Sequence, residues 1–292
     1  MANTLDPMKQ EARAATLQEV LYEKWVGKLI ANTKFENLFT GNDTVHFPRL
    51  APIVSQDLTT SYTDVTVQDL TTTDETFVLD TRKHFAFSIS DEDMIEMKVD
   101  PQSQAIQDGA EAFAGDYDTA IMAEYANAAY TVDDGNMEVA TNGWAGNPII
   151  LTNDNVYDML TAVSETMNVN NMPMSDRFVV ISPKEERFLR KSDFFVQATS
   201  KGDEVVANGI IGRALGMNIV LSNNVNVLGL NRNLIAWAGK PVCFAANIRP
   251  NVQFTPSQYR NSFTNLVKAQ TKFGVKTFTE GANRMIHIPV VA

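Results

Sequence analysis

The sequence has few of the residues that disulfide-bonded proteins and metalloenzymes need. It contains one cysteine, Cys243, and three histidines, His46, His84 and His287, among 292 residues. A single thiol excludes an intramolecular disulfide and is typical of a reducing compartment. No apolar run approaches the ~20 residues of a membrane-spanning helix, and the N-terminal stretch lacks the basic and apolar regions of a signal peptide. We therefore expect a protein made in the cytoplasm with no membrane partner.

Acidic residues are missing from one quarter of a chain that is acidic overall. The formal net charge is -11, yet the 75 residues from Val205 to Thr279 contain eight Lys or Arg and no Asp or Glu. Residues 51–140 have the opposite bias, with 19 acids and 3 bases. This asymmetry fits a protein whose oppositely charged halves meet in neighbouring copies. It fits equally well a chain whose halves attract each other within one subunit, so charge alone leaves both interpretations open.

Composition and periodicity predict a globular chain with extended parts. Hydrophobic residues make up 44% and charged residues 20%, which fits one large domain or two closely packed ones. Apolar residues at three- and four-residue steps predict an amphipathic helix over 8–31. We expect this helix to be an arm that packs on a neighbouring copy through Trp25 and Leu29. From 45 to 90 the alternation of apolar and polar residues predicts a β-ribbon, which is too polar to be stable unless it lies on something else.

A long helix is predicted after the ribbon. Ser90 can cap a short helical turn, and Asp100 then caps the long helix, with Pro101 at its first position. An apolar stripe continues to about Tyr130; it consists of Ile106, Ala110, Phe113, Ala114, Tyr117, Ile121, Tyr125 and Ala128. A helix of about 29 residues would be ~43 Å long. We expect it to form the spine of its domain.

The second half of the chain alternates between helical and strand patterns. A helix capped by Thr152 or Asn153 is followed by a buried strand, "RFVVIS", and by a helix with Pro183 at its first position. Short apolar strands are predicted at "MNIVLSNNV", "NLIAWAG" and "PVCFAA". The section "VQFTPSQYRNSFTNLVKAQTKFGVKTF" then alternates again, and "RMIHIPVVA" closes the chain.

No pattern predicts a catalytic residue, a metal site or a cofactor site. The histidines are scattered outside any zinc motif, so each is expected to satisfy a local hydrogen bond. Cys243 lies in an apolar run and is expected to be a buried structural thiol. The carboxylates Asp91, Glu92, Asp93 and Glu96 lack the glycine turn and distal glutamate of an EF-hand loop. Their place at a helix N-terminus is explained by the helix dipole.

The glycines of "NGIIGRALGM" are not spaced for nucleotide binding. Gly209, Gly212 and Gly216 match neither the dinucleotide motif nor a P-loop. We expect them to let a turn and a strand pack closely. The eight basic residues between 205 and 279 are too dispersed to predict an RNA-recognition motif.

The order of the predicted elements resembles a known family of shell proteins. The stretch "HFAFSISDEDMIEMKVDPQSQAIQDGAEAFAGDYDTAIMAEYANAA" is similar to a strand that leaves an extended loop and enters a spine helix. The stretches "RFVVISPKEERFLRKSDFF" and "ANGIIGRALGMNIVLSNNV" are similar to the strand, helix and glycine turn of an axial domain. Together they resemble the major capsid (coat) protein of tailed bacteriophages, whose fold is shared with encapsulins and the herpesvirus capsid floor.

This resemblance implies an α+β fold divided into five segments. They are an N-terminal arm (1–44), an extended β-hairpin loop (45–90), a peripheral domain with the spine helix (91–140), an axial domain (141–248) and closing strands of the peripheral domain (249–292). It also implies a structural, non-enzymatic protein that assembles into pentamers and hexamers of an icosahedral virion capsid. The shell would enclose double-stranded DNA without sequence-specific binding.

The resemblance implies partners besides further copies of the chain. Since the chain reaches the expected arm soon after Met1, we expect any scaffold to be a separate protein. A portal and a decoration protein are further expected partners. In this setting, the acidic ribbon and spine of one subunit would meet the basic segments of another, for example at Arg260, Lys268 or Lys272.

Two alternatives stay open at the level of the sequence. The first is an encapsulin-like compartment, which has the same fold but encloses cargo enzymes. The second is an enzyme that uses Asp91, Glu92 and Asp93 with a metal ion. Micrographs of the purified protein would separate shells from small particles.

Overall fold

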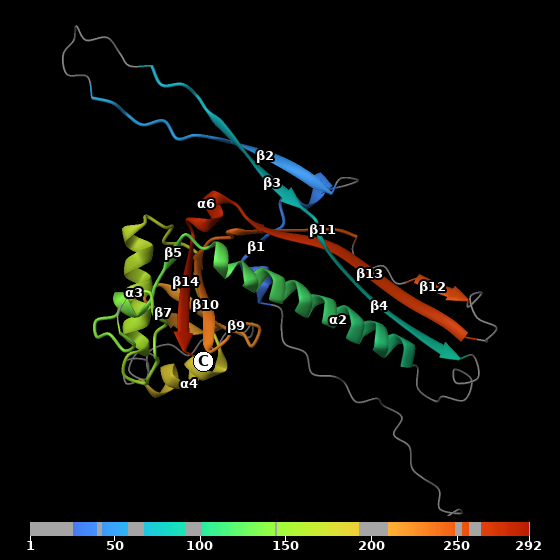
Figure 1. Cartoon of the computed structure of the whole chain (residues 1–292). Coiled ribbons are helices and arrows are strands. Elements are labelled where there is room, and N and C mark those ends of the chain that lie inside the picture. Colours follow the sequence, from blue (N-terminus) through green and yellow to red (C-terminus); the bar gives the residue numbers. More distant parts are fainter. Residues whose placement is uncertain are drawn as a thin grey trace, which may run out of the picture.

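The computed structural model places the chain as an elongated α+β subunit with a projecting ribbon (Figure 1). It describes residues 26–39, 43–57, 67–90, 101–143, 145–192, 210–248, 253–256 and 264–291. Within these ranges, no helix is long and apolar enough to cross a membrane.

A seven-stranded sheet forms the more compact end of the subunit. Its strand order is β5-β14-β10-β6-β8-β7, and β9 pairs with β10. The strands are β5 (Tyr130–Thr131), β6 (Arg177–Ile181), β7 (Ile210–Ala214), β8 (Met217–Leu221), β9 (Asn226–Leu228), β10 (Asn231–Ala238) and β14 (Met285–Val291). The central strand β10 is buried from Asn233 to Ala238, so this sheet has the main apolar core beside it.

Two helices flank this sheet, and the sequence predicted one start correctly. Helix α4 (Pro183–Lys191) begins at the expected proline, and Ser182 and Glu185 form a capping box. Helix α3 (Val156–Val169) begins later than the predicted cap at Thr152 or Asn153. The Asn155 side chain accepts a hydrogen bond from Thr152 N–H at 2.7 Å and donates one to the carbonyl of Ile150. These bonds fold 150–155 into a turn, which delays the helix.

A five-stranded sheet and the spine helix form the elongated end. The sheet order is β1-β11-β13-β12, with β4 on the other edge of β13. The strands are β1 (Ala31–Asn32), β4 (Thr81–Ser90), β11 (Val242–Ile248), β12 (Gln253–Pro256) and β13 (Thr264–Thr277). Strand β4 therefore leaves the ribbon and joins a sheet with β13, in register from Thr264↔Ser90 to Phe273↔Thr81.

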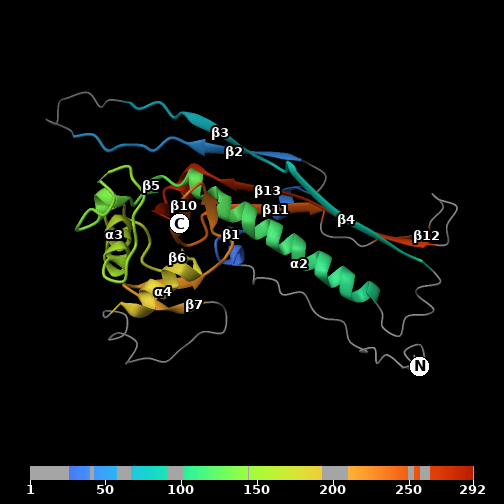
Figure 2. The same cartoon turned by 60° about the horizontal axis from the view of Figure 1, so that its bottom comes forward.

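The spine helix α2 spans Pro101–Met122 and covers one face of this sheet (Figure 2). Aromatic contacts join the two layers. The ring centroids of Phe113 and Phe85 lie 5.2 Å apart, and those of Tyr117 and Phe273 lie 4.7 Å apart. The predicted extension to Tyr130 is too long, because a 3-10 turn, η4 (Ala123–Asn127), follows Met122. The stripe is buried at Phe113 and Ile121 but exposed at Ala110.

Two strands, β2 (Thr44–Leu50) and β3 (Thr72–Val78), form the ribbon. They are antiparallel, in register from Thr44↔Val78 to Leu50↔Thr72. The ribbon passes along the body and its outer arms run clear of it in both views (Figures 1 and 2). A short helix, α6 (Thr279–Ala282), lies beneath the base of the ribbon, between β13 and β14.

The predicted N-terminal helix lies mostly outside the described residues, and its C-terminal end is wrong. The chain forms a 3-10 turn, η2 (Gly27–Leu29), and then enters β1, where Ala31 pairs with Val242. A second 3-10 turn, η3 (Glu36–Phe39), follows. Ile30 is fully buried and Leu29 packs partly against the same core of its own subunit, whereas Trp25 lies outside the described residues. Pairing with β11 and burial of Ile30 outweigh the helical periodicity of this segment.

Candidate functional site

The residue types that most often form catalytic or metal sites do not cluster in the described part of the chain. No group of three or more His, Cys, Asp or Glu side chains there could hold a metal ion. His46 lies 2.5 Å from Asp74 on the ribbon, and His287 lies 2.9 Å from the Asn233 side chain. His84 is exposed on β4. The expectation of local hydrogen bonds is thus confirmed for two of the three histidines.

Cys243 is a buried thiol, as expected. Burial raises its pKa to about 11, which keeps it protonated and unreactive at neutral pH. Asp91, Glu92, Asp93 and Glu96 lie outside the described residues, as does Gly209. Gly216 forms the β7–β8 turn together with Leu215, with φ values of 78° and 51°. Nothing lies within 4 Å of a Cβ added at Gly216, so this glycine serves the positive φ of the turn and not the close packing that was expected.

The base of the ribbon is bound firmly to its own subunit. Phe77 and Leu79 are buried in a small core with Phe39, Cys243 and Ala245. Polar contacts tie the same region to α6: Arg49 contacts the Glu280 carboxylate at 2.5 Å, and Glu75 accepts hydrogen bonds from the Thr279 backbone and side chain. The ribbon therefore projects from a fixed position.

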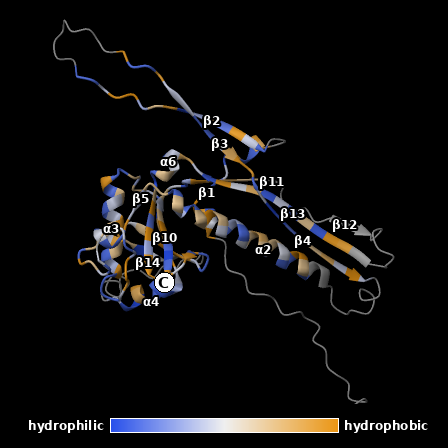
Figure 3. Cartoon of the chain, viewed as in Figure 1, coloured by the Kyte–Doolittle hydropathy of each residue, from blue (hydrophilic) through white to orange (hydrophobic). Residues whose placement is uncertain are grey.

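The outer part of the ribbon is exposed and continues beyond the two strands. Ala51 donates a backbone hydrogen bond to Thr71, and the Gln68 side-chain amide both donates to and accepts from the backbone of Val54. Hydrophobic and hydrophilic residues alternate along these arms (Figure 3). The exposed apolar side chains are Leu50, Ile53, Val54, Val67 and Leu70. This is apolar surface that the described subunit does not cover.

One of the three basic residues that were expected to contact a neighbour is paired within the chain. Lys272, which the sequence suggested as a contact for a neighbour's ribbon, lies 2.5 Å from Asp43 with only 8% of its side chain exposed. Lys83 lies 3.2 Å from Asp116 on the spine helix. Lys268 stays exposed on β13, and Arg260 lies outside the described residues. The proposed role of Lys272 between subunits is therefore wrong.

A buried carboxylate joins three parts of the subunit. Asp118 on α2 accepts hydrogen bonds from the backbone N–H groups of Val26 and Gly27, at 3.1 and 2.5 Å, and from the Asn224 side chain at 2.8 Å. Burial raises the pKa of Asp118, and the three hydrogen bonds partly oppose this shift. No local pattern in the sequence marks this junction, because its donors lie about a hundred residues away on either side.

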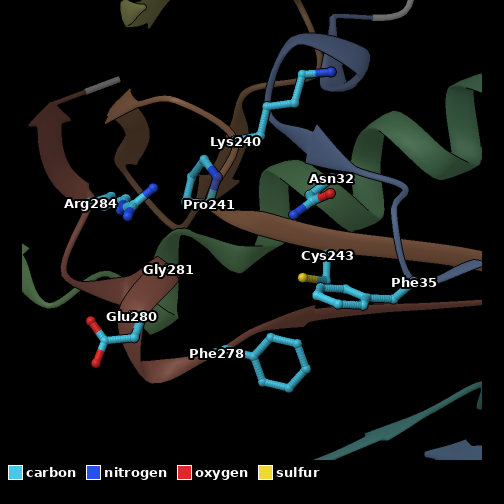
Figure 4. Close-up of a pocket in the computed structure, with 9 residues that line it drawn as sticks. All are labelled: Asn32, Phe35, Lys240, Pro241, Cys243, Phe278, Glu280, Gly281 and Arg284. Carbon is cyan, nitrogen blue, oxygen red and sulfur yellow. The ribbon is translucent and has the colours of Figure 1, made fainter. Parts of the chain in front are cut away.

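A hollow of about 180 Å³ lies where the ribbon base meets the body. Its walls come from the segment after β1, from the β10–β11 turn and from α6 (Figure 4). Phe35, Cys243 and Phe278 supply apolar surface, and Figure 4 shows the Cys243 sulfur and the Phe278 ring on the same hollow. Lys240 and Arg284 add positive charge to its lining. The hollow lacks the nucleophile–base pair or carboxylate pair that catalysis would need.

Comparison with known proteins shows the family of the chain. The model of the family described as "Phage capsid protein" matches residues 72–278. The chain belongs to the phage capsid protein family. The match runs from β3 of the ribbon through the spine helix and both sheets to the start of α6, so it covers most of the elements described above.

Several solved structures have the same fold as this capsid protein. A chain of Mycobacterium phage Che8 superimposes with a TM-score of 0.77 at 19% identity, over 96% of each chain. A chain from the capsid of Cyanophage P-SCSP1u gives 0.74 at 15% identity, over 100% of this chain and 95% of that one. A chain from the mature capsid of bacteriophage PhiM1 gives 0.72 at 11% identity, over 97% and 92%. Among curated proteins, no sequence matches significantly.

The capsid family confirms the fold and the structural role expected from the resemblance. It does not favour the encapsulin-like alternative. It is a family of structural proteins and not a class of enzymes.

Proposed function

We propose that this capsid protein assembles into the pentamers and hexamers of an icosahedral phage head that encloses double-stranded DNA. The outer ribbon is the observation that carries this proposal. It has a fixed base, exposed apolar side chains and acids without bases from Ala51 to Thr81. A surface of that kind gains stability when it lies on a neighbouring copy.

The proposed shell assigns a role to each of the five segments. Residues 1–44 form the arm, 45–90 the extended loop, 91–140 the peripheral domain, 141–248 the axial domain and 249–292 the closing strands. Two strands link these segments: β4 of the loop pairs with β13, and β14 of the closing segment pairs with β10. The proposed partners are a separate scaffolding protein, a portal and a decoration protein, with synthesis in the host cytoplasm. DNA is enclosed without sequence-specific contacts.

Shortening the ribbon tests this proposal. Ala51 and Thr71 already share a backbone hydrogen bond, so Asn-Gly in place of residues 52–70 would close the hairpin with a two-residue turn. The base would stay intact, because Phe77 and Leu79 are retained. We expect unchanged thermal unfolding of the free subunit and no shells in electron micrographs. Shells of normal size from the shortened chain would contradict the proposal.

A second variant keeps the length of the ribbon and removes only its exposed apolar side chains. Ser in place of Ile53, Val54, Val67 and Leu70 removes apolar surface that the subunit does not bury. This variant should also unfold normally and assemble poorly. If it assembles as well as the parent chain, the apolar side chains are not the contact.

A further inference from the structure

We propose that the hollow beside α6 receives the outer ribbon segment Val67–Leu70 of a neighbouring copy. This inference rests on the proposed function, because it names the surface on which the ribbon docks. It commits to one occupant, a second copy of this chain.

The walls of the hollow are held in place by close packing contacts within the subunit. Gly281 of α6 lies so close to the β10–β11 turn that a Cβ there would be 2.2 Å from the Pro241 carbonyl oxygen. The helix is therefore seated tightly on one wall. Phe278 packs edge-on against Phe47 of the ribbon base, with ring centroids 4.9 Å apart, and this contact fixes a second wall. An apolar side chain entering the hollow would meet preformed apolar surface.

The lining of the hollow carries net positive charge. The Glu280 carboxylate is already engaged by Arg49, at 2.5 Å. Lys240 and Arg284 are exposed, and neither forms an ion pair with another residue in the described part of the chain. A docking segment should therefore carry negative charge.

The outer ribbon has the matching chemistry. Val67 and Leu70 are 85% and 65% exposed, and the exposed Asp69 lies between them. Seating one of these apolar side chains against Phe278 and Cys243 would bring Asp69 toward Arg284 or Lys240. The ends of the described ribbon arms stand clear of their own α6 (Figure 1), so the segment is placed to reach another copy and not its own hollow.

Photo-crosslinking in assembled particles tests the docking directly. Benzoylphenylalanine in place of Leu70, followed by irradiation and peptide mapping, should link position 70 to residues 35, 240–243 or 278–284 of another chain. The same chain irradiated before assembly should give no such link. Links only to β4 or β13, links formed within unassembled subunits, or no links in well-formed shells would each overturn the proposal. In these cases the shells themselves would leave the proposed function standing.

Charge exchange provides a second and independent measurement. Asp69→Arg should raise the subunit concentration needed for assembly at low salt by about three- to fivefold, the size expected for one exposed ion pair. Adding Arg284→Asp to Asp69→Arg should restore assembly, whereas adding Lys268→Asp should not. Rescue by Lys268→Asp alone would place the ribbon on the face of β13 and overturn the assignment to the hollow. Absence of shells from the parent chain would instead refute the proposed function.

Discussion

The Lys272 ammonium group on β13 lies 2.5 Å from the Asp43 carboxylate, next to the start of ribbon strand β2 in the same chain. Together with the Lys83–Asp116 and Arg49–Glu280 pairs, this ion pair links acidic and basic parts within the subunit. Some of the acidic and basic groups behind the charge asymmetry of the sequence therefore pair with each other within one chain. Lys240, Lys268 and Arg284 remain exposed and available for contacts between copies.

The two residues of the Lys272–Asp43 pair should differ in how much their replacement destabilises the subunit. Asp43→Asn leaves a lysine that is 8% exposed without its carboxylate, whereas Lys272→Met leaves an aspartate that is 58% exposed and can be hydrated. We therefore expect Asp43→Asn to lower the free energy of unfolding more than Lys272→Met does. Urea denaturation of the free subunit at neutral pH measures both. The reverse order would mean that the pair does not stabilise the ribbon base.

The same pair predicts a pH dependence. The hydrogen bond from Lys272 lowers the pKa of Asp43 in the folded subunit. A carboxylate with a lowered pKa stabilises the fold above its unfolded pKa, and this contribution is lost as the pH falls through the folded pKa. Asp43→Asn should therefore weaken the acid dependence of unfolding relative to the parent chain.

Asp118 should be sensitive to exchange of its carboxylate for an amide. In Asp118→Asn, the remaining side-chain oxygen can still accept hydrogen bonds from Val26 and Gly27. The new NH₂ group, however, replaces the oxygen that accepts from the Asn224 side chain, so two donors face each other. The clash and the lost bond should cost about 1–3 kcal/mol. Adding Asn224→Asp restores a donor–acceptor pair and should recover about half of the loss, if the two side chains act as one unit. Denaturant titration of the four chains measures the coupling, and strict additivity would contradict it.

The raised pKa of Asp118 has the opposite pH signature to that of Asp43. Because burial disfavours the ionised form, this group stabilises the fold most below its unfolded pKa, and the contribution is lost as the pH rises through the folded pKa. The Asp118→Asn variant should lack that decline as the pH rises above the unfolded pKa of an aspartate. A parallel decline in the variant and the parent chain would show that Asp118 ionises without cost.

Gly274 should be intolerant of a single added methyl group. A Cβ there would be 2.4 Å from the Val78 carbonyl oxygen, so the glycine lets the ribbon lie directly on β13. Gly274→Ala should cost about 1–3 kcal/mol through overpacking. Gly115→Ala is the matched control: nothing lies within 4 Å of its Cβ, and α2 should gain about 0.5–1 kcal/mol from the better helix former. Equal stability of the two variants would show that the ribbon base can shift freely.

The start of the described chain should matter more to stability than the segment that precedes it. Ile30 is fully buried in the main core, so Ile30→Ala should cost about 2–5 kcal/mol. Leu38 is 49% exposed, so Leu38→Ala should stay within about 0.5 kcal/mol of the parent. Deletion of residues 1–25 should leave thermal unfolding nearly unchanged, since Val26, Ile30 and Ala31 of the main core are retained. Loss of the fold on this deletion would mean that earlier residues belong to the core.

Local chemistry made parts of this fold predictable from the sequence. Pro183 and Ser182 mark the start of α4, and alternating residues mark the ribbon, because these signals act over a few residues. The β4–β13 pairing joins residues far apart in the chain, and no local pattern sets its register. The end of the predicted arm helix failed for the same reason, since β1 depends on pairing with Val242.

The functional surfaces were predictable only in outline. Polar composition identified the ribbon as an element that needs a support, but not the Gln68 bridge that holds its outer arms together. The hollow beside α6 is built from three separated segments, and its residues share no sequence motif. Lys272 was misassigned because charge counts cannot show that Asp43 lies beside it.

The attachment of the ribbon to α6 also has a mechanical consequence. The short helix is the crossing at which the chain passes from β13 in one sheet to β14 in the other, and Arg49 and Glu75 of the ribbon hold it. The crossing is braced from below by Glu124, which accepts a hydrogen bond from Thr277 N–H at 3.0 Å. The ribbon is thus attached to the short segment that connects the two sheets, so the position of the ribbon is coupled to the positions of both sheets.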